Sequence, residues 1–294
     1  MHKAGFVNII GNPNVGKSTL MNALVGEKLS IITSKAQTTR HRILGIVNGD
    51  DFQIVFSDTP GILKPCYKLQ ESMMNFVRGA LSDADVLLYV TDTVERDDER
   101  AAEIIDRIRQ SGVPTLVVVN KIDLTTQEAL EALVEKWRAT LPDAEIIPIS
   151  AREGFNIAGL FDRILALLPE GEPFYPKDTL TDKTLRFFAS EIIREKILRN
   201  YDKEIPYSCE IEIEEYREEP GIDRISAVIY VARNSQKGIL IGHKGEKLKK
   251  VGQQAREDME QFLGKKVFLQ LFVKVSEDWR NDQRQLRRFG YDPQ

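Results

Sequence analysis

Residues 11–18 (GNPNVGKS) match the pattern G-x-x-x-x-G-K-[ST], which is typical of phosphate-binding loops. The apolar run FVNII precedes them and a helical pattern begins near Lys17, so the loop joins a strand to a helix. Backbone N–H groups of such a loop surround phosphate oxygens, and the helix N-terminus adds partial positive charge. We expect Lys17 to contact the β- and γ-phosphates of a nucleotide and Ser18 to ligate Mg²⁺. The residues expected to surround the phosphates are Gly11, Asn12, Pro13, Asn14, Val15, Gly16, Lys17, Ser18 and Thr19.

A second motif, DTPG at residues 58–61, begins 40 residues after Ser18. Its carboxylate can join the Mg²⁺ shell, and the Gly61 N–H can donate to the γ-phosphate. On its own this tetrapeptide is equally a good turn, but its place after the phosphate loop favours the nucleotide site. The residues expected to contact the nucleotide here are Asp58, Thr59, Pro60, Gly61 and Ile62.

The NKID motif at residues 120–123 indicates which base is bound. It follows an apolar strand pattern, so it should lie in the crevice at the strand carboxyl ends. The Asp123 carboxylate can accept hydrogen bonds from guanine N1–H and the exocyclic amine, whereas adenine offers neither donor there, so we expect ATP to be rejected. A polar turn is the alternative interpretation, but several motifs in this order argue against it. The residues expected to bind the base are Asn120, Lys121, Ile122 and Asp123, with Ser150 and Ala151 offering backbone N–H groups to guanine O6.

A second glycine loop occurs near the other end of the chain, in GILIGHKGEKLKKVG at residues 238–252. The pattern G-x-x-G before a lysine-rich helix is typical of a loop that clamps a single-stranded nucleic-acid backbone. Alone it is a weak signal, because many helical joints contain two glycines. We expect the apolar residues of ISAVIYV (residues 225–231) to help floor a groove for bases, and His243 to contact phosphate or solvent rather than act as a catalyst. The residues expected to contact RNA are Ile239, Ile241, Gly242, His243, Lys244, Gly245 and Lys247.

These motifs fit a two-domain organisation. Strand and helix patterns alternate through the first half, which predicts a doubly wound α/β sheet, with a hairpin at Asn48-Gly49. A Pro-rich stretch follows, and beyond it the order helix, two strands, short helix, glycine loop, long helix and strand predicts an α+β domain. The expected boundaries are 1–168, a linker at 169–182, a second domain at 183–279 and a basic tail at 280–294. The tail arginines Arg284, Arg287 and Arg288 either extend the backbone contacts or are solvated.

Charge and composition limit the function classes. The net charge is −4, which alone argues against a nucleic-acid-binding protein, but the chain from Gln236 onward holds 13 Lys and Arg against 8 Asp and Glu. A localised polyanion site or a solvated charged helix would explain this excess. Cys66 and Cys209 lack metal-ligand spacing and fit a reducing, cytoplasmic compartment. No apolar run is long enough to span a bilayer, whereas a peripheral contact at the inner face of the cell membrane stays compatible.

The first 168 residues resemble the translation-factor-like P-loop GTPases, in the branch that includes TrmE, Der and Era. The resemblance implies a switch segment, SKAQTTRHR at residues 34–42, in which Thr39, or otherwise Thr38, ligates Mg²⁺ when the γ-phosphate is present. Asn14 matches the asparagine that ligates K⁺ in this branch. Ile62 stands where Ras-like GTPases place a water-orienting glutamine, so we expect slow intrinsic hydrolysis of GTP to GDP. The residues expected to act in hydrolysis are Lys17, Asn14, Thr39 and Gly61.

The second half resembles a type II KH domain. A GTPase domain joined to such a domain resembles the Era-like family of bacterial GTPases. That resemblance implies binding to the 3′ end of small-subunit ribosomal RNA and a role in assembling the small ribosomal subunit. We expect a monomer. The alternative is a GTP-dependent adaptor that docks a protein or membrane surface through its C-terminal domain. A P-loop kinase for small molecules is disfavoured by the NKID motif.

Overall fold

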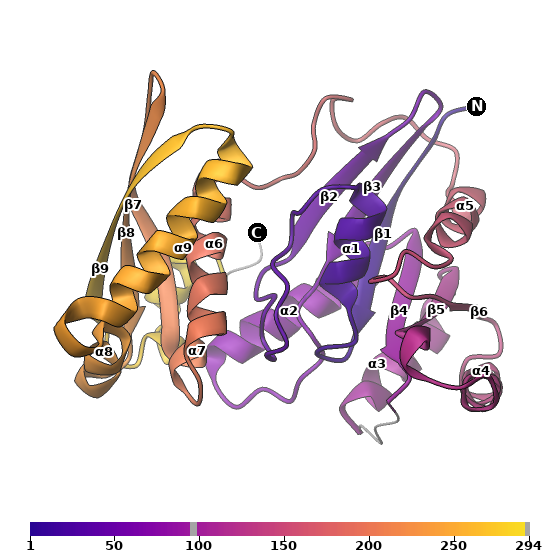
Figure 1. Ribbon diagram of the computed structural model, residues 1–294. Helices are drawn as coiled ribbons and strands as arrows, with labels where there is room; N and C mark the ends of the chain where they lie inside the picture. The colour runs from indigo at the N-terminus through magenta and orange to yellow at the C-terminus, as the bar shows by residue number, and fades with distance from the viewer. Residues whose placement is uncertain (95–98, 292–294) are drawn as a thin grey trace. The chain divides into compact units, whose positions relative to one another are not determined.

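The computed structural model describes residues 1–94 and 99–291. They form two units: Met1–Cys66 with Gln70–Asp182, and Tyr67–Leu69 with the chain from Lys183 onward (Figure 1). No helix among these residues is long and apolar enough to cross a membrane.

The first unit is built on a six-stranded sheet in the order β2-β3-β1-β4-β5-β6. β2 and β3 pair antiparallel around Asn48-Gly49, as the hairpin signal predicts, and the other neighbours are parallel. The strands are β1 (Lys3–Gly11), β2 (Ile43–Asn48), β3 (Phe52–Asp58), β4 (Val86–Asp92), β5 (Thr115–Asn120) and β6 (Glu145–Pro148). The predicted P-loop α/β fold is therefore confirmed.

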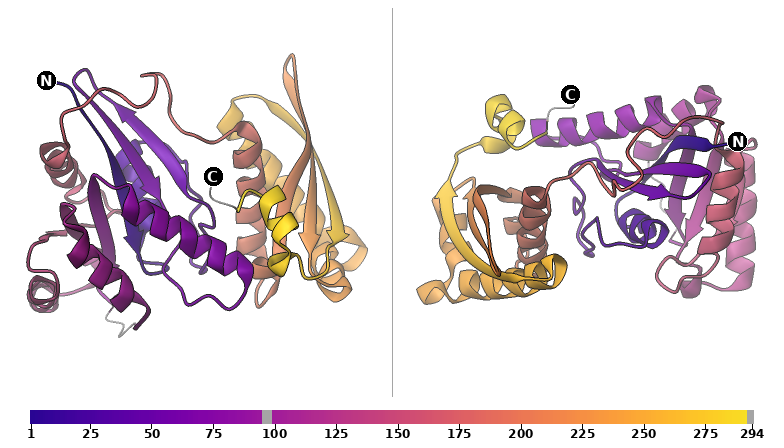
Figure 2. Two further views of the ribbon diagram at one scale, coloured as in Figure 1. Left: turned by 180° about the vertical axis from the view of Figure 1, so that it is seen from behind. Right: turned by 90° about the horizontal axis from the view of Figure 1, so that it is seen from above.

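Helices cover both faces of this sheet (Figure 2). They are α1 (Lys17–Val25), α2 (Lys68–Ser82), α3 (Glu99–Ser111), α4 (Gln127–Thr140) and α5 (Ile157–Leu167), with a 3-10 turn η1 (Ile122–Leu124). Apolar residues of α2, α3 and α4 pack with β4 and β5 in one core cluster. On the other face, the ring of Phe161 on α5 lies against the rings of Phe52 and Phe56 on β3. All six β5 residues are buried, which explains why parallel strands appear in the sequence as continuous apolar runs.

The second unit is a three-stranded sheet, β7-β8-β9, and the helices that precede β9 in the chain pack on one face of it. β7 and β8 are antiparallel, and β8 and β9 are parallel. The elements are α6 (Leu185–Asn200), α7 (Ile205–Ser208), β7 (Cys209–Glu219), β8 (Ile222–Val231), α8 (Asn234–Ile241), η2 (His243–Gly245), α9 (Glu246–Leu263), β9 (Lys266–Val275), η3 (Trp279–Asn281) and α10 (Gln283–Arg288). This order confirms the predicted KH arrangement.

The segment expected as a linker, residues 169–182, lies along the first unit. Glu170 bridges to Lys3 and Thr181 bridges to Gly45, and the Ile46 N–H donates to the Leu180 carbonyl at 2.8 Å. These backbone contacts attach the segment to β1 and β2 of the first unit.

The C-terminal residues that were expected to form a basic tail pack on the second unit. Trp279, Leu286 and Tyr291 are buried, and the Trp279 indole N–H donates to the Ser208 carbonyl at 3.0 Å. Arg288 forms an ion pair with Glu212 at 2.5 Å, so its charge is already paired within the protein. Arg284, Arg287 and Arg288 are all exposed, whereas the apolar side chains hold the segment against the sheet. Residues 292–294 lie outside the described residues.

Candidate functional site

The phosphate loop lies between the end of β1 and the start of α1, where the sequence predicts it. Gly16 caps α1 in the left-handed region, with φ 97°, and a Cβ there would lie 2.2 Å from the Asn120 amide nitrogen. Only glycine satisfies both demands. The loop borders a cavity of about 450 Å³, large enough for a nucleotide's phosphates and ribose. Predicted residues that line it are Pro13, Asn14, Gly16, Lys17, Ser18, Thr19, Thr38, Thr39, Thr59, Gly61 and Lys121.

Lys17 supplies a buried cation to this cavity. Its side chain is 6% exposed, and its ammonium donates to the Gly11 and Asn12 carbonyls at 3.0 and 2.8 Å. Burial lowers the pKa of Lys17 to about 8, against which the nearby Asp58 carboxylate acts. The negative charge of a bound phosphate would stabilise the protonated form of Lys17, because it substitutes for the hydration that burial has removed.

We expect nucleotide affinity to fall as pH rises through 8. Free Lys17 loses its proton near pH 8, whereas phosphate binding needs the ammonium, so binding above that pH must take up a proton. The dissociation constant for GDP should rise about fourfold between pH 7 and pH 8.5. Fluorescence titration with a labelled GDP measures this. Lys17→Met should bind weakly with a flat profile, and an equal slope in that variant would assign the titration to another group.

Three oxygen-bearing side chains converge beside Lys17. Ser18 Oγ lies 2.7 Å from Asp58 Oδ2 and 2.8 Å from Thr39 Oγ1, and Thr39 Oγ1 lies 3.3 Å from the same carboxylate oxygen. Burial raises the pKa of Asp58, while Lys17 and the hydroxyls of Ser18, Ser30 and Thr39 lower it. The buried Asp58 Oδ1 has no hydrogen-bond partner among the described residues. Such a hard, oxygen-only set with an unsatisfied carboxylate oxygen fits Mg²⁺.

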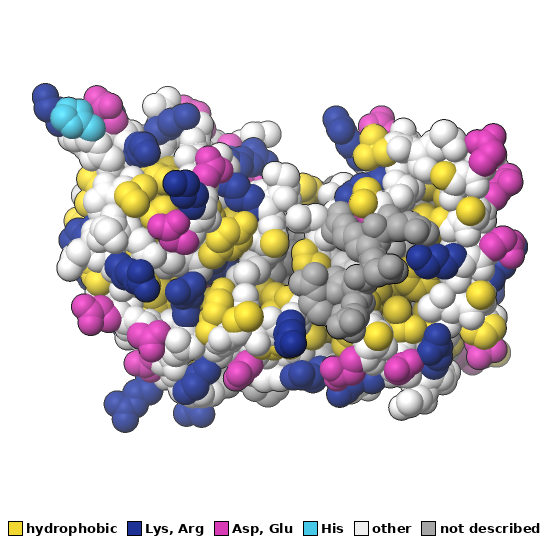
Figure 3. Space-filling model, turned by 90° about the horizontal axis from the view of Figure 1, so that it is seen from below, with side chains coloured by type: hydrophobic (Ala, Val, Ile, Leu, Met, Phe, Trp, Pro, Cys, Tyr) yellow, Lys and Arg dark blue, Asp and Glu magenta, His cyan; other side chains and the backbone are white. Residues whose placement is uncertain are grey.

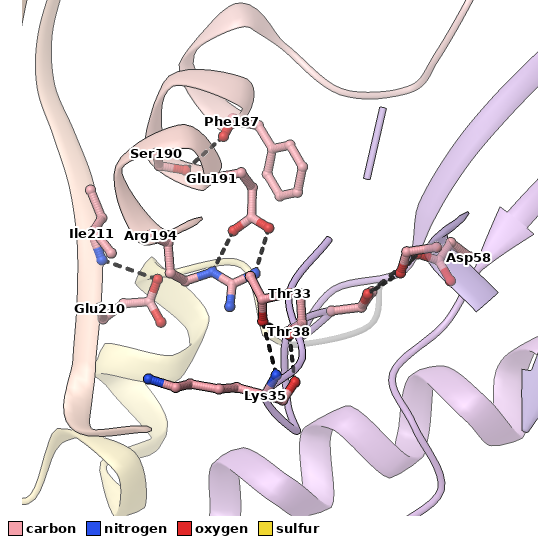
Figure 4. Close-up of polar contacts among 12 residues, drawn as sticks. Thr33, Lys35, Thr38, Asp58, Phe187, Ser190, Glu191, Arg194, Glu210 and Ile211 are labelled. Atoms are coloured by element: carbon pink, nitrogen blue, oxygen red, sulfur yellow. Dashed lines mark hydrogen bonds and ion pairs between the residues drawn. The ribbon is translucent and has the colours of Figure 1, made fainter. Parts of the chain in front are cut away.

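The two threonines of the switch segment occupy different places. Thr39 is buried against Ser18 and Asp58. The Thr38 hydroxyl instead contacts Thr33 Oγ1 and donates to the Lys35 carbonyl, both at 2.6 Å (Figure 4). Of the two alternatives that the sequence leaves open, the geometry favours Thr39 as the metal ligand.

The DTPG segment is fixed against the phosphate loop. Thr59 Oγ1 donates to the Ile9 carbonyl at 2.7 Å, and the Ile62 N–H donates to the Gly11 carbonyl at 3.1 Å. A Cβ on Gly61 would lie 2.8–2.9 Å from backbone atoms of Pro13. The Ile62 side chain is buried in the core cluster of α2 and α3, so it offers the cavity no group that could orient water.

The base-recognition residues are joined to the phosphate loop by hydrogen bonds. Asn120 donates to the Val15 carbonyl and accepts from the Ala151 N–H, both at 2.9 Å. Ser150 Oγ donates to Asp123 Oδ1 at 2.6 Å, which orients the carboxylate. The structure thus brings together strand ends that are far apart in sequence. Asp123, Ser150 and Ala151 lie beyond the lining of the cavity itself.

Lys121 has a partner that sequence analysis missed. Its ammonium donates to the Asn14 carbonyl at 2.6 Å and forms an ion pair with Asp92 at 2.7 Å. Asp92 is 2% exposed and ends β4, the strand between β1 and β5. The sequence could have indicated Asp92, because it lies at the carboxyl end of a central parallel strand, where ligand sites of such sheets occur. Further cavity residues that were not predicted are Ile31, Ile32, Thr33 and Arg152, whereas Ser34, Lys35 and Gln37 belong to the predicted switch segment.

The second glycine loop joins α8 to α9. Gly242 has φ 75° and ψ −179°, a conformation that is essentially restricted to glycine, and Gly245 caps α9 in the left-handed region. His243 and Lys244 are exposed between them, and the Lys247 stem packs beside Gly242. Lys and Arg side chains are spread over this unit on the face seen in Figure 3, with Asp and Glu side chains among them. The loop therefore presents open backbone and positive charge together.

A groove of about 550 Å³ leads from this loop between α9 and β9. Its lining residues are Gly245, Leu248, Lys249, Gly252, Gln253, Arg256, Leu269 and Leu271. The expectation that residues 225–231 floor it is wrong: alternate residues of that run face the core, because β8 is the central strand under the helices. Ile241 packs against the same core, and Ile239 is exposed on α8. Neither isoleucine is among the lining residues of the groove.

Comparisons with known proteins agree with this geometry. A family described as 50S ribosome-binding GTPase matches residues 6–121, and the KH domain family matches residues 204–280. GTPase Era of Syntrophus aciditrophicus is 47% identical over 99% of this chain and 96% of its own. GTPase Era of Staphylococcus haemolyticus is 45% identical over 99% of this chain and 97% of its own.

Two solved structures are similar over nearly the whole chain, each with a TM-score of 0.95 and 42% identity. One is a variant of Aquifex aeolicus Era bound to GDP and AlF₄⁻, matched over 99% of this chain and 100% of that chain. The other is Era in complex with MgGDPNP and nucleotides 1506–1542 of 16S ribosomal RNA, matched over all of both chains.

Proposed function

The chain belongs to the Era family of GTPases, and we propose that it is a GTP-driven switch that binds the 3′ end of small-subunit ribosomal RNA and assists assembly of the small ribosomal subunit. One observation carries this proposal: the chain builds two separate phosphate-binding sites, a guanine-nucleotide cavity and a KH groove. The similar Era structure with MgGDPNP and 16S ribosomal RNA supports the same assignment.

In the nucleotide site, we propose that each residue acts through position and charge. Lys17 neutralises the β- and γ-phosphates, and the Gly61 N–H donates to the γ-phosphate. Ser18, Thr39 and Asp58 would hold Mg²⁺, which would neutralise phosphate charge as the bond breaks. Asp123 and Asn120 fix the base. Because Ile62 is buried in the core, no side chain at that position orients the attacking water, and intrinsic hydrolysis is slow.

We further propose that K⁺ accelerates this hydrolysis through Asn14. Asn14 is exposed at the cavity in the left-handed region, with φ 64°, and its carbonyl is held by Lys121. A K⁺ beside the phosphates would act somewhat as an arginine finger does, by balancing charge in the transition state. Turnover should be several-fold faster in K⁺ than in Na⁺ at equal ionic strength. Equal turnover in both salts, or a full K⁺ response in Asn14→Ala, would contradict the proposal that K⁺ acts through Asn14.

Binding of RNA to the groove is tested with a single substitution at the loop. Gly245→Asp places a carboxylate where the RNA backbone should pass, and αL backbone tolerates Asp. We expect affinity for a 3′-end ribosomal RNA oligonucleotide to fall roughly 30-fold at fixed salt, with GTP hydrolysis unchanged.

The matched control is Gly264→Asp at the other end of the same helix. Gly264 is also left-handed, and a Cβ at either glycine meets no described atom within 4 Å. RNA binding that is equally reduced by both variants would reflect net charge alone. RNA binding untouched by Gly245→Asp would favour the adaptor function instead. Repeating the titration with a non-hydrolysable GTP analogue and with GDP gives the sign of nucleotide coupling.

We also propose a cytoplasmic monomer that makes peripheral contacts at the inner face of the membrane. Each site is complete within one chain, which supports the monomer. Basic side chains over the second unit support the membrane contact, because anionic headgroups attract the same charges as RNA does. Sedimentation equilibrium and flotation with anionic vesicles test these two statements.

A further inference from the structure

The reverse face of the strand that borders the RNA groove carries two exposed phenylalanines. Along β9, Leu269 and Leu271 point to the groove, whereas the alternate residues point to the opposite face of the sheet. On that face Phe268 is 43% and Phe272 is 47% exposed. A solvated sheet face ordinarily carries polar residues, so two half-exposed rings on one edge strand need an explanation.

The C-terminal segment covers the neighbouring part of this face. Tyr230, on β8, packs against Phe289 with ring centroids 5.5 Å apart, and Phe289 packs against Trp279 at 5.7 Å. Tyr291 donates to Glu210 on β7. The chain therefore has apolar anchors that shield β7 and the end of β8, while both rings on β9 stay open to solvent.

The surroundings of the two rings are nearly neutral. The Arg224 guanidinium lies 5.3 Å from the Phe268 ring centroid, in register with it across the strands, and pairs with Glu219 at 3.1 Å. Further along β9, Lys266 pairs with Glu260 at 3.3 Å and Lys274 with Glu214 at 2.8 Å. Because these cations already have carboxylate partners, the patch offers flat aromatic surface rather than unbalanced charge. Unpaired nucleobases are partners of that kind, since every base has a π-face.

Position connects this patch to the groove. β9 is at the edge of the sheet and pairs with β8 alone among the described strands. An RNA strand that leaves the groove therefore reaches the reverse face of the sheet by crossing β9 only. We propose that RNA bound in the groove continues around the edge of β9 and stacks flanking bases on Phe268 and Phe272. This inference rests on the proposed RNA function and assigns to it a second contact surface, the aromatic patch of Phe268 and Phe272. The patch would bind unpaired nucleotides next to the segment in the groove without distinguishing their sequence.

The test compares a short RNA that fills the groove with versions extended by three unpaired nucleotides at the 5′ or the 3′ end. For the wild-type chain, one extension should tighten binding roughly 5- to 150-fold, the range for one stacked base. The double variant Phe268→Leu with Phe272→Leu keeps apolar bulk but removes the rings. It should bind the short RNA as the wild type does and lose the gain from extension. A 2-aminopurine in the extension should be quenched by the wild type and not by the variant.

Phe262→Leu is the matched control, since Phe262 is also 43% exposed but lies at the end of α9 against Phe188. It should keep the full gain from extension. A wild-type chain that binds the short RNA and gains nothing from either extension overturns the stacking proposal while leaving the RNA function intact, as does a Leu variant that keeps the gain. Failure of the wild type to bind even the short RNA overturns the RNA function itself.

Discussion

Replacing Asp123 with Asn should change the preferred base from guanine to xanthine. The carboxylate accepts from guanine N1–H and the exocyclic amine, whereas an Asn amide presents one acceptor and one donor. The amide N–H₂ group of Asn would face the exocyclic amine of guanine, and two donors cannot form a hydrogen bond. In xanthine the same position is the C2 carbonyl, which would accept a hydrogen bond from the amide. Because Ser150 Oγ holds Asp123 Oδ1 at 2.6 Å, the replacement oxygen keeps its place. We expect GDP affinity to fall at least about 10³-fold and XDP to become the tighter ligand.

Competition against a labelled nucleotide by GDP, XDP and ADP measures this change. Ser150→Ala is the control, because it removes the bond that orients the carboxylate but keeps the carboxylate itself. It should weaken GDP about tenfold without favouring XDP. Retained guanine preference in Asp123→Asn would place base recognition elsewhere in the site.

The substitution Gly61→Ala should separate hydrolysis from binding. The added methyl would lie 2.8–2.9 Å from Pro13 backbone atoms, and the Ile62 N–H bond to Gly11 leaves the segment little room to retreat. The Gly61 N–H is then displaced from the γ-phosphate, a donor worth about 10²–10³ in rate at comparable sites. We expect single-turnover GTP hydrolysis to fall by about 10²-fold, while GDP, which lacks that phosphate, binds within about threefold of the wild type.

Gly79→Ala provides the control for this variant. Gly79 lies inside α2, its backbone is not left-handed, and a Cβ there meets no described atom within 4 Å. Alanine is the better helix former, so the control should hydrolyse GTP normally and unfold at the same or higher temperature. A Gly61→Ala chain with normal hydrolysis would show that the N–H of this residue does not act on the γ-phosphate.

Most of the nucleotide site could be predicted because its residues follow buried parallel strands. Lys17, Asp58, Asn120 and Ser150 come from four separate segments, and each follows an apolar run whose end is fixed by the sheet. The order of the motifs therefore determines their place in space. Thr39 could be separated from Thr38 only in three dimensions, because adjacent residues of a loop have no periodicity that assigns their directions.

The groove of the second unit was harder to predict. Residues 225–231 and β9 are both apolar and β-branched or aromatic, so pattern alone does not show which strand is central. The sheet order decides it: β8 is covered by the helices, and β9 borders α9. Likewise, the ion pair of Asp92 with Lys121 depends on the adjacency of β4 and β5, which no local motif reveals.

The single amide of Asn120 joins the two ends of the nucleotide site, since it contacts Val15 in the phosphate loop and Ala151 beside the base. Guanosine and pyrophosphate should therefore bind with positive cooperativity, that is, with a favourable coupling free energy, because each organises the half of the cavity that the other occupies. Energies of substitutions at the two ends should not add in a double-mutant cycle unless Asn120 is removed. Exchange of GDP for GTP then becomes a concerted event, in which loosening either end of the site loosens both.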